Sequence, residues 1–313
     1  MKKLLFLKKA FGMKALTLFM ALVLTFALSA CGGGDTNKDS EASSSAPKKE
    51  ESSGKKDKLA EIKERGVLYL GTSPDFPPCE FYYLDEKNQK QIDGYDIRLG
   101  KAIAEDLGVK LEIKATDFNG VLANIQAGQV DMGISGFTAT EKRKESMQFS
   151  KGYNTTTEEG YQGIMLKKET ASKFKTLEDL KKANLKIGAQ GGSIQFELAL
   201  KLTGPDKVVQ RDTMDSLALA LDAGDIDAIT VSSDATKPIL QTFKDFVVLP
   251  KDNFNLDPDN MYATNVIGFP LGDQYQSLIE ESNKVIDQLQ KEGKIEKWIE
   301  ECKVISEKAA QAQ

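Results

Sequence analysis

The chain has 313 residues, enough for two domains of ordinary size, and its 40% hydrophobic and 28% charged residues are typical of a soluble globular protein. The formal net charge is −5, and the part after residue 30 carries −10, because residues 1–30 hold five Lys and no acid; so acidic a body is a poor partner for nucleic acid. The absence of His and the presence of only three Cys exclude His general bases, Ser-His and Cys-His nucleophiles, His-ligated metals and multi-cysteine zinc sites, so we expect no metal and no cofactor.

Residues 1–30 are predicted to be a lipoprotein signal peptide. Basic residues precede the apolar run Ala15–Leu28, as in a secretory signal. The following residues, Leu28-Ser29-Ala30-Cys31, resemble the lipobox of bacterial lipoproteins, which implies cleavage before Cys31 and lipidation of its thiol. An ordinary signal followed by a free Cys is the alternative, and either Met1 or Met13 can serve as the initiator.

Residues 31–58 are predicted to be the lipidated Cys and a disordered tether. Gly32–Lys58 contains no Ile, Leu, Val, Phe, Trp or Tyr, so it cannot bury enough surface to offset its ordering entropy. A flexible chain of about 27 residues spans roughly 5–6 Å × √27, or about 30 Å. This composition favours a tether that holds a folded body away from a membrane.

The folded body begins near Leu59 with an α/β pattern. Strands alternate with helices at the spacing of an α/β sheet. The strands are expected at Val67–Gly71, Lys110–Ala115 and Val130–Ile134, and the helices at Tyr95–Leu107, ended by Gly108, and Asn119–Ala127, ended by Gly128.

The stretch Ser135–Arg143 is the strongest candidate binding constellation. Gly136 follows a strand, where a Gly lets backbone N–H groups approach a ligand, and Thr140 is a good N-cap for a helix. Exposed N–H groups, two threonine hydroxyls and the Arg143 guanidinium would then surround one point, which suits a carboxylate. A solvated basic face over residues 142–144 is the alternative.

An internal echo indicates two lobes of similar design. Residues 122–131 (LANIQAGQVD) are matched 96 positions later by residues 218–227 (ALALDAGDID), and both read as a helix, an Ala-Gly stop and a strand. An offset of 96 is too long for a solenoid period. The match aligns the 136–138 loop with residues 232–234, so each lobe would present a polar loop at the strand end where α/β sheets bind ligands. Chance repetition of a common helix stop is the alternative.

The second half of the chain continues the α/β pattern. Lys186–Ser193 is expected to be a strand that runs into a Gly-rich turn, but it lacks the Gly-Lys-Ser/Thr ending of a phosphate-binding P-loop. Further elements are expected at Phe196–Leu202 (helix), Val266–Phe269 (strand) and Tyr275–Cys302 (amphipathic helix interrupted at Gly293).

A set of ordered motifs carries a family resemblance. They read GTSPDFPP (71–78), DGYDI (93–97), DFNG (117–120), TATEKR (138–143), FSKGY (149–153), LEDL (177–180) and IGAQ (187–190). Together they resemble the extracellular solute-binding proteins of polar amino-acid ABC transporters, of the family 3 type, over about residues 59–302. The resemblance implies an α/β, type II periplasmic-binding-protein-like fold, in which each of two lobes is a β-sheet flanked by helices.

The same resemblance implies the domain organisation. Two hinge segments, near residues 153–157 and 261–265, would join the lobes. Lobe 1 would be discontinuous, comprising residues 59–155 and 264–313, and lobe 2 would comprise residues 156–263.

The resemblance also implies a ligand-binding site for one amino acid between the lobes. The α-carboxylate would bind Arg143 as salt-bridge partner, with Thr138 and the Gly136 backbone as donors. Aromatic side chains would flank the ligand, although core packing is the alternative for Phe118. The complete expected set is Ser73, Phe76, Phe118, Ser135, Gly136, Thr138, Arg143, Gln190, Ser193, Ile194, Ser232 and Asp234.

Several positions depart from the family pattern. Ser73 stands where glutamine- and histidine-binding relatives carry an Asp that reads the side chain, and Ser232 stands where many relatives carry the acid that binds the α-ammonium. In a strand-like conformation Asp234 would point to the same side as Ser232 and supply that charge, with Ser232 as a further acceptor. Capping of the following helix is the alternative for Asp234. The identity of the amino acid, and whether Cys79 and Cys302 pair, stay open.

The expected function is that of a non-catalytic, monomeric substrate-binding lipoprotein of an ABC importer. It would be exported, anchored by lipid to the outer face of the cell membrane, as suits a Gram-positive cell, and would deliver a polar amino acid to a permease and its ATPase. Two alternatives stay open: a sensory lipoprotein that feeds no transporter, and an exported enzyme similar to cyclohexadienyl dehydratases.

Overall fold

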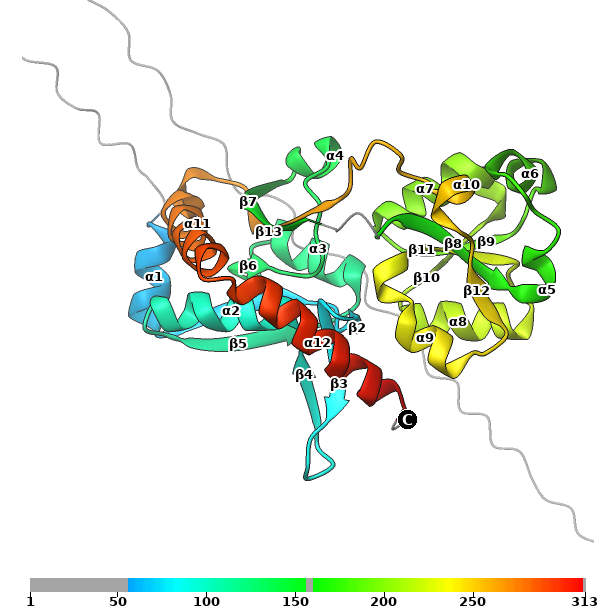
Figure 1. Cartoon of the computed structure of the whole chain (residues 1–313). Coiled ribbons are helices and arrows are strands. Elements are labelled where there is room, and N and C mark those ends of the chain that lie inside the picture. Colours follow the sequence, from blue (N-terminus) through cyan, green and yellow to red (C-terminus); the bar gives the residue numbers. More distant parts are fainter. Residues whose placement is uncertain (1–55, 156–159, 312–313) are drawn as a thin grey trace, which may run out of the picture. The chain divides into compact units, whose positions relative to one another are not determined.

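The computed structural model describes residues 56–155 and 160–311, which belong to one compact unit (Figure 1). The expected signal peptide, Cys31 and nearly all of the expected tether lie outside the described residues. Helix α1 (Lys58–Arg65) begins at Lys58, the last residue of the expected tether, because the Asp57 carboxylate accepts the N–H of Ala60 at 2.8 Å and caps the first turn. Within the described ranges, no helix is both long and apolar enough to span a bilayer.

The first sheet has the strand order β5-β1-β6-β13-β7. β1 runs parallel to β5 and β6, whereas β13 runs antiparallel to β6 and β7. The bounds are β1 (Val67–Thr72), β5 (Lys110–Ala115), β6 (Met132–Gly133), β7 (Met147–Thr155) and β13 (Thr264–Pro270). β6 is shorter than the expected strand Val130–Ile134, because the ladder to β1 pairs only Met132 and Gly133.

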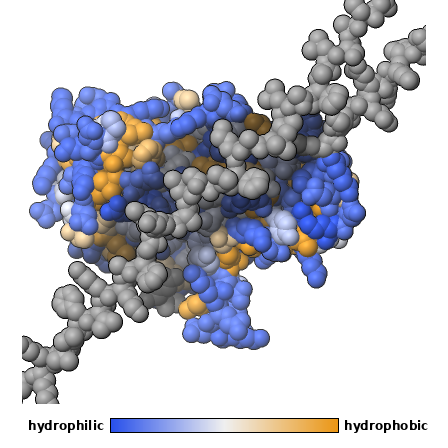
Figure 2. All heavy atoms as spheres, turned by 180° about the vertical axis from the view of Figure 1, so that it is seen from behind, coloured by the Kyte–Doolittle hydropathy of each residue, from blue (hydrophilic) through white to orange (hydrophobic). Residues whose placement is uncertain are grey.

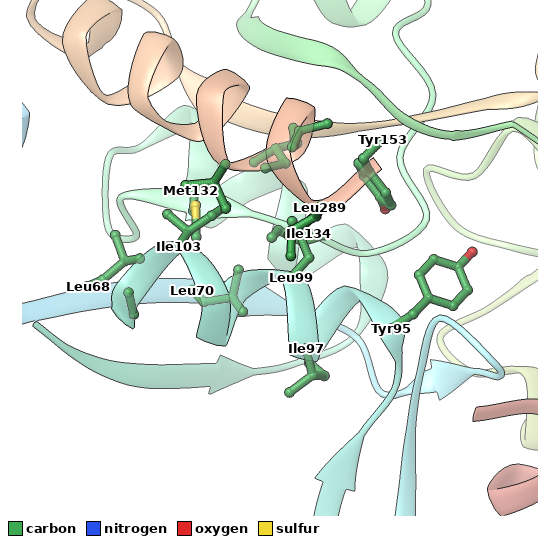
Figure 3. Packing of buried hydrophobic residues seen from close by; sticks show 14 of the residues in the cluster. Leu68, Leu70, Tyr95, Ile97, Leu99, Ile103, Met132, Ile134, Tyr153 and Leu289 are labelled. Atoms are coloured by element: carbon green, nitrogen blue, oxygen red, sulfur yellow. The ribbon is translucent and has the colours of Figure 1, made fainter. Parts of the chain in front are cut away.

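Helices cover both faces of this sheet. On one face α1, α2 (Tyr95–Asp106) and α11 (Gln276–Lys291) bury a cluster that includes Leu70, Ile103 and Leu289 (Figure 3). On the other face α3 (Phe118–Gln126) buries Val121 and Ile125. A side sheet of order β2-β3-β4 and the one-turn helix α4 complete the lobe; their bounds are β2 (Asp75–Phe76), β3 (Glu80–Leu84), β4 (Lys90–Asp93) and α4 (Glu141–Lys144).

The second sheet has the strand order β10-β9-β11-β8-β12. Both faces of this sheet are covered by helices, and successive side chains of β8 point to opposite faces. Ile164 and Leu166 of β8 pack with α6 and α7, whereas Met165 between them packs with α8. The strands are β8 (Gln162–Lys167), β9 (Ile187–Gln190), β10 (Val208–Arg211), β11 (Ala228–Ser232) and β12 (Phe246–Val248). The helices are α5 (Lys168–Ala171), α6 (Leu177–Ala183), α7 (Ile194–Thr203), α8 (Met214–Ala223), α9 (Lys237–Thr242) and α10 (Lys251–Phe254).

The internal echo corresponds to one structural unit that occurs in both sheets. α3 and α8 are each followed by a left-handed Gly, Gly128 (φ 66°) and Gly224 (φ 79°). The Asp131 carboxylate then accepts the backbone N–H of Tyr69 at 2.8 Å, and Asp227 accepts that of Lys186 at 2.8 Å. The expected two-lobe α/β fold is therefore confirmed.

The two sheets are connected where β7 ends and β13 begins. These strands pair antiparallel, with Asn154 opposite Asn265. The last helix, α12 (Lys294–Gln311), continues beyond Cys302, where the expected helix ended, because its added turns contact α9 and include an ion pair between Glu307 and Lys237. Cys79 and Cys302 are both buried and unpaired.

The face of the molecule seen in Figure 2 is mainly hydrophilic, with small hydrophobic spots between polar side chains. Exposed large hydrophobic residues occur on separate elements, for example Leu84 on β3, Leu219 on α8 and Val304 on α12. Scattered exposure of this kind is ordinary for a soluble domain and does not by itself indicate an interface.

Candidate ligand-binding cleft

A cavity of about 140 Å³ lies between residues of the two sheets. One side of the cavity is formed by β2, β3, the loop after β6 and the strands β7 and β13. The other side is formed by residues at the ends of β9 and β11 and just after them. Its lining includes eleven of the twelve expected ligand residues; the exception is Ser73. The cavity is lined by Asp75, Phe76, Pro77, Pro78, Cys79, Glu80, Tyr95, Phe118, Ser135, Gly136, Thr138, Arg143, Asn154, Thr155, Gln162, Gln190, Ser193, Ile194, Gln195, Ser232, Asp234, Ala235, Tyr262, Asn265, Ile299 and Lys303.

Ser73 is a buried supporting residue at the end of β1. Its backbone N–H donates to Ser135 Oγ at 3.0 Å, and its hydroxyl donates to Asp75 Oδ1 at 2.8 Å. Ser73 therefore orients two groups of the cavity wall, and Asp75, two residues further along, presents a carboxylate to the cavity.

The loop after β6 lines the cavity together with Arg143. Gly136 has φ +57°, and a Cβ there would approach the Phe76 ring to 3.1 Å, so both the backbone and the space favour Gly. The expectation that the Gly136 N–H points to a ligand needs correction, because this N–H donates to Asp96 Oδ2 at 2.8 Å. The Thr138 hydroxyl donates to the backbone oxygen of Tyr262 at 3.3 Å.

The Arg143 side chain reaches from α4 toward the second lobe. Thr140 caps α4 as expected, accepting the Arg143 N–H at 3.2 Å. One guanidinium nitrogen donates to Thr138 O and the other to Gly192 O, each at 3.0 Å. The guanidinium carbon lies 5.4 Å from the centre of the Phe118 ring, within the range of a cation–π contact.

The guanidinium of Arg143 has hydrogen-bond capacity left for a ligand. Two of its five N–H groups are used by the carbonyl oxygens, and within the described ranges no carboxylate forms an ion pair with it. Burial lowers the pKa of Arg143 to about 10, which leaves it charged at neutral pH. An anionic group placed in the cavity would therefore meet a partly desolvated cation, the setting in which such a contact is strong.

Phe118 lines the cavity and also packs in the core, the two roles that the sequence left open. Its ring is 8% exposed and lines the cavity, yet it also packs against Phe137, with ring centres 5.4 Å apart. Phe76 is half-buried beside Gly136 and lines the same cavity. The two rings thus border the cavity from different elements, β2 and α3.

The second lobe contributes the start of α7. Ser193 caps this helix by accepting the Phe196 N–H at 3.1 Å, and its own hydroxyl donates to Gln190 O at 2.7 Å. The Gln190 amide donates to Asp75 Oδ2 at 2.8 Å and to Asp212 O at 2.9 Å. Ile194, the first residue of α7, adds an apolar contact surface that is 8% exposed.

Ser232 and Asp234 both line the cavity, but not through the expected strand geometry. β11 ends at Ser232, and residues 233–235 form a 3-10 turn closed by the Thr236 N–H on Ser233 O. The same-side argument for a strand therefore does not apply. Asp234 lines the cavity together with first-lobe residues, and its charge contributes to raising the pKa of Cys79, although burial of Cys79 is the main cause.

Hinge residues that sequence reasoning missed also line the cavity. The Tyr95 hydroxyl oxygen accepts from the side-chain amides of Asn154 and Asn265, each at 3.2 Å, and lies 2.8 Å from Cys79 Sγ. With both lone pairs of the oxygen used, its proton is left for the sulfur. Tyr95 stands within the DGYDI motif (93–97), but only the pairing of Asn154 with Asn265 brings the two amides to it.

Other missed residues come from distant elements: Gln162, Gln195, Tyr262, Ile299 and Lys303. Lys303 and Ile299 lie on α12, far along the chain from the binding motifs. They do not stand out in the sequence, because a local amphipathic pattern does not reveal a turn that borders a cavity.

The chain is similar to known proteins of one family. Residues 68–301 match the model of bacterial extracellular solute-binding proteins, family 3. The arginine-binding extracellular protein ArtP of Bacillus subtilis is 28% identical over 91% of this chain and 95% of its own length, and the L-cystine-binding protein TcyJ of Escherichia coli is 28% identical over 77% and 85%.

A solved structure agrees with these sequence relatives. The amino acid ABC transporter substrate-binding protein AbpA of Streptococcus pneumoniae, bound to L-arginine, is 29% identical and superposes with a TM-score of 0.68, covering 79% of this chain and 98% of its own. Together with the two-sheet fold and the cavity between the sheets, the family match over most of the length leads to one conclusion: the chain belongs to the bacterial extracellular solute-binding proteins of family 3.

Proposed function

We propose that the protein captures one polar amino acid between its lobes and delivers it to an ABC permease and its ATPase. The observation that carries this proposal is Arg143, a partly desolvated cation with unused N–H groups at a cavity bordered by both lobes. The relatives ArtP and AbpA, named for or bound to arginine, and TcyJ, named for L-cystine, bind polar amino acids.

The ligand's two charged poles suggest its orientation. The α-carboxylate would pair with Arg143 on the first lobe, and the α-ammonium would lie toward the acidic groups Asp234 and Asp75. An ammonium taken out of water needs such compensation. The Gly136 N–H is already bonded to Asp96, and the single Thr138 O–H to the backbone oxygen of Tyr262, so the unused N–H groups of Arg143 supply the donors and the loop shapes the cavity wall.

A thermal-shift screen followed by calorimetry tests the proposal. The ligand set is the twenty amino acids plus ornithine, citrulline and cystine, with agmatine, which is arginine without its carboxylate, as a matched control. A ligand at 100-fold its Kd stabilises the native state by about 2.7 kcal/mol. We expect a rise in Tm with one or a few polar amino acids and none with agmatine; no response to any amino acid would refute the proposed function.

The proposal includes export and anchoring through Cys31, which would make the protein a monomeric lipoprotein on the outer face of the membrane. Export and anchoring are supported by the lipobox-like residues 28–31 and by the following residues 32–58, which are poor in apolar side chains. Cys31→Ser should abolish metabolic labelling with palmitate and release the chain from membranes or leave it unprocessed. Unchanged labelling of the mutant would contradict the anchor without affecting the binding proposal.

A further inference from the structure

Two carboxyl groups lie buried against the loop that follows β6. Glu80, on β3, and Asp96, on α2, are both fully buried. Glu80 Oε1 accepts the Ser135 hydroxyl at 2.9 Å, and Asp96 Oδ2 accepts the Gly136 N–H at 2.8 Å. Two consecutive residues of the ligand loop are therefore held by two acids from different elements.

The hydrogen bonds distinguish the two acids. Asp96 accepts on both oxygens, from the Gly136 N–H and, at 2.8 Å, from the Tyr153 hydroxyl, which is the pattern of an ionised carboxylate. Glu80 accepts on Oε1 only; among the described residues no donor reaches its buried Oε2. A bare buried carboxylate oxygen is costly, whereas an O–H at that atom would have the Asp96 carboxylate as a neighbouring acceptor.

We propose that Glu80 is protonated at neutral pH and forms, with ionised Asp96, a singly charged pair that positions Ser135 and Gly136 for ligand binding. The inference rests on the proposed function, because the loop matters through the ligand it faces. The pair acts through the loop: Glu80 borders the cavity, but neither acid has exposed surface, and their described hydrogen bonds are to protein groups. Its single charge meets the donors of the loop, and a second charge would add repulsion between two buried carboxylates.

The surroundings of the pair act in the same direction. Burial raises the pKa of Glu80 well above its ordinary range, and the charge of Asp96 and the hydrogen bond between the two acids raise it further. Burial also raises the pKa of Asp96, to about 6, against the hydrogen bonds from Gly136, Glu80 and Tyr153. The titratable and charged groups that face the pair and the adjoining cavity are Asp75, Cys79, Tyr95, Tyr153, Asp234 and Cys302, with the cations Arg143 and Lys303 across the cavity.

A proton fits this cluster better than a metal ion does. Cys79, Glu80 and Asp96 bring potential ligand atoms within 4.8 Å of one another. However, both Asp96 oxygens already accept hydrogen bonds, and Cys79 Sγ lies at hydrogen-bond distance from the Tyr95 hydroxyl. Treatment with EDTA should therefore leave ligand affinity unchanged. A loss of affinity that added zinc restores would show that a metal ion, and not a proton, occupies the cluster.

The first experiment detects the proton without any ligand. Infrared spectra of the ligand-free protein at neutral pH should contain the C=O band of a protonated carboxylic acid, shifted in D₂O. E80Q should lack this band, whereas the matched control D131N, which removes another buried carboxylate of the same lobe, should retain it. Persistence of the band in E80Q, or its absence from the wild type, would overturn the proposal.

The second experiment tests positioning. Gln at position 80 reproduces the protonated acid, with an oxygen for Ser135 and an N–H for Asp96, whereas Ala provides neither. With L-arginine as first probe and L-glutamine and L-cystine as the next, E80A should weaken binding about tenfold or more, since a hydrogen bond to a charged group contributes on the order of 1.5–3 kcal/mol. E80Q should recover most of that loss.

The pH profile separates positioning from a merely structural role. At alkaline pH the wild type loses the proton of Glu80 and should lose affinity for the ligand. E80Q has no such proton, so its affinity should fall only where the ligand ammonium and Arg143 lose their protons. Above neutral pH, where Asp96 is already ionised, the Gly136 amide resonance of the ligand-free protein should titrate in the wild type and stay constant in E80Q. Identical profiles, or E80Q no better than E80A, would refute the positioning pair; absence of all binding with a normal infrared result would instead refute the proposed function.

Discussion

The Asp75 carboxylate of the first lobe accepts a hydrogen bond from the Gln190 side-chain amide of the second lobe at 2.8 Å. The same oxygen, Oδ2, also accepts the backbone N–H of Met214 at 3.1 Å, at the start of α8. Because α8 begins there, its N-terminal dipole adds to the attraction. Asp75 therefore links the first lobe to two elements of the second lobe, β9 and α8.

Asp75→Asn should weaken ligand binding by loosening this contact. An amide offers one acceptor oxygen, while three donors converge on Asp75, so at least one hydrogen bond is lost. A charge-assisted bond contributes about 1.5–3 kcal/mol, which corresponds to roughly 10- to 100-fold in Kd. Calorimetry gives the affinity, and solution scattering should show a smaller ligand-induced decrease in radius of gyration. Asp85→Asn, at an exposed turn beside the same small sheet, is the matched control and should bind normally.

Arg143→Ala should cause the largest loss of affinity among single substitutions in the first lobe. Removing one partner of a desolvated charge pair costs on the order of 2–5 kcal/mol, or roughly 30- to 5,000-fold. Arg98, which pairs with Asp93 at 2.8 Å and is absent from the cavity lining, is the control: Arg98→Ala should lower Tm but leave Kd unchanged. Binding of Arg143→Ala within about threefold of wild type would contradict the carboxylate assignment.

Asp234→Asn should reduce affinity more than Ser232→Ala does. Both residues line the cavity, but only Asp234 brings a charge that compensates an ammonium group. The Tm of each variant without ligand is measured alongside, so that a loss of affinity is separated from a loss of folding. Calorimetry of each variant decides the matter, and the opposite order of affinities would assign the ammonium to Ser232.

The buried acids predict how stability depends on pH. A carboxyl whose pKa is raised on folding keeps its proton in the native state after the unfolded chain has lost it, so stability falls as pH rises between the two values. For Asp96, burial raises the pKa from 3.8 to about 6, and the corresponding loss across that window is roughly 3 kcal/mol at about 1.36 kcal/mol per pKa unit. The loss due to Glu80 extends to higher pH.

Urea unfolding of the wild type and E80Q at a series of pH values measures this effect. Because Gln does not titrate, the stability advantage of E80Q over the wild type should widen as pH rises from about 4.5 through neutrality. D131N reports the effect of losing a different buried carboxylate, one paired with Arg65. A gap between E80Q and wild type that is constant with pH would show that Glu80 titrates normally.

Sequence patterns by themselves determined the elements and the family of this protein. Helix α2 and strand β5 occupy the expected ranges to within a residue or two, and Thr140 caps α4 where it was placed. The repeat of residues 122–131 at 218–227 indicates two lobes. These signals are local, because caps, Gly stops and periodic burial depend on neighbours within one turn or one strand.

The tertiary structure alone decided which groups meet at the cavity. Ser135 and Glu80 are 55 positions apart, Gly136 and Asp96 are 40 apart, and Gln190 and Asp75 are 115 apart. Nothing in a local pattern specifies such pairings, since they result from the order of strands in each sheet and the packing of helices on it. That is why the Gly136 N–H, expected to face the ligand, is instead committed to a buried acid, and why Asp234 reaches the cavity from a 3-10 turn and not from a strand.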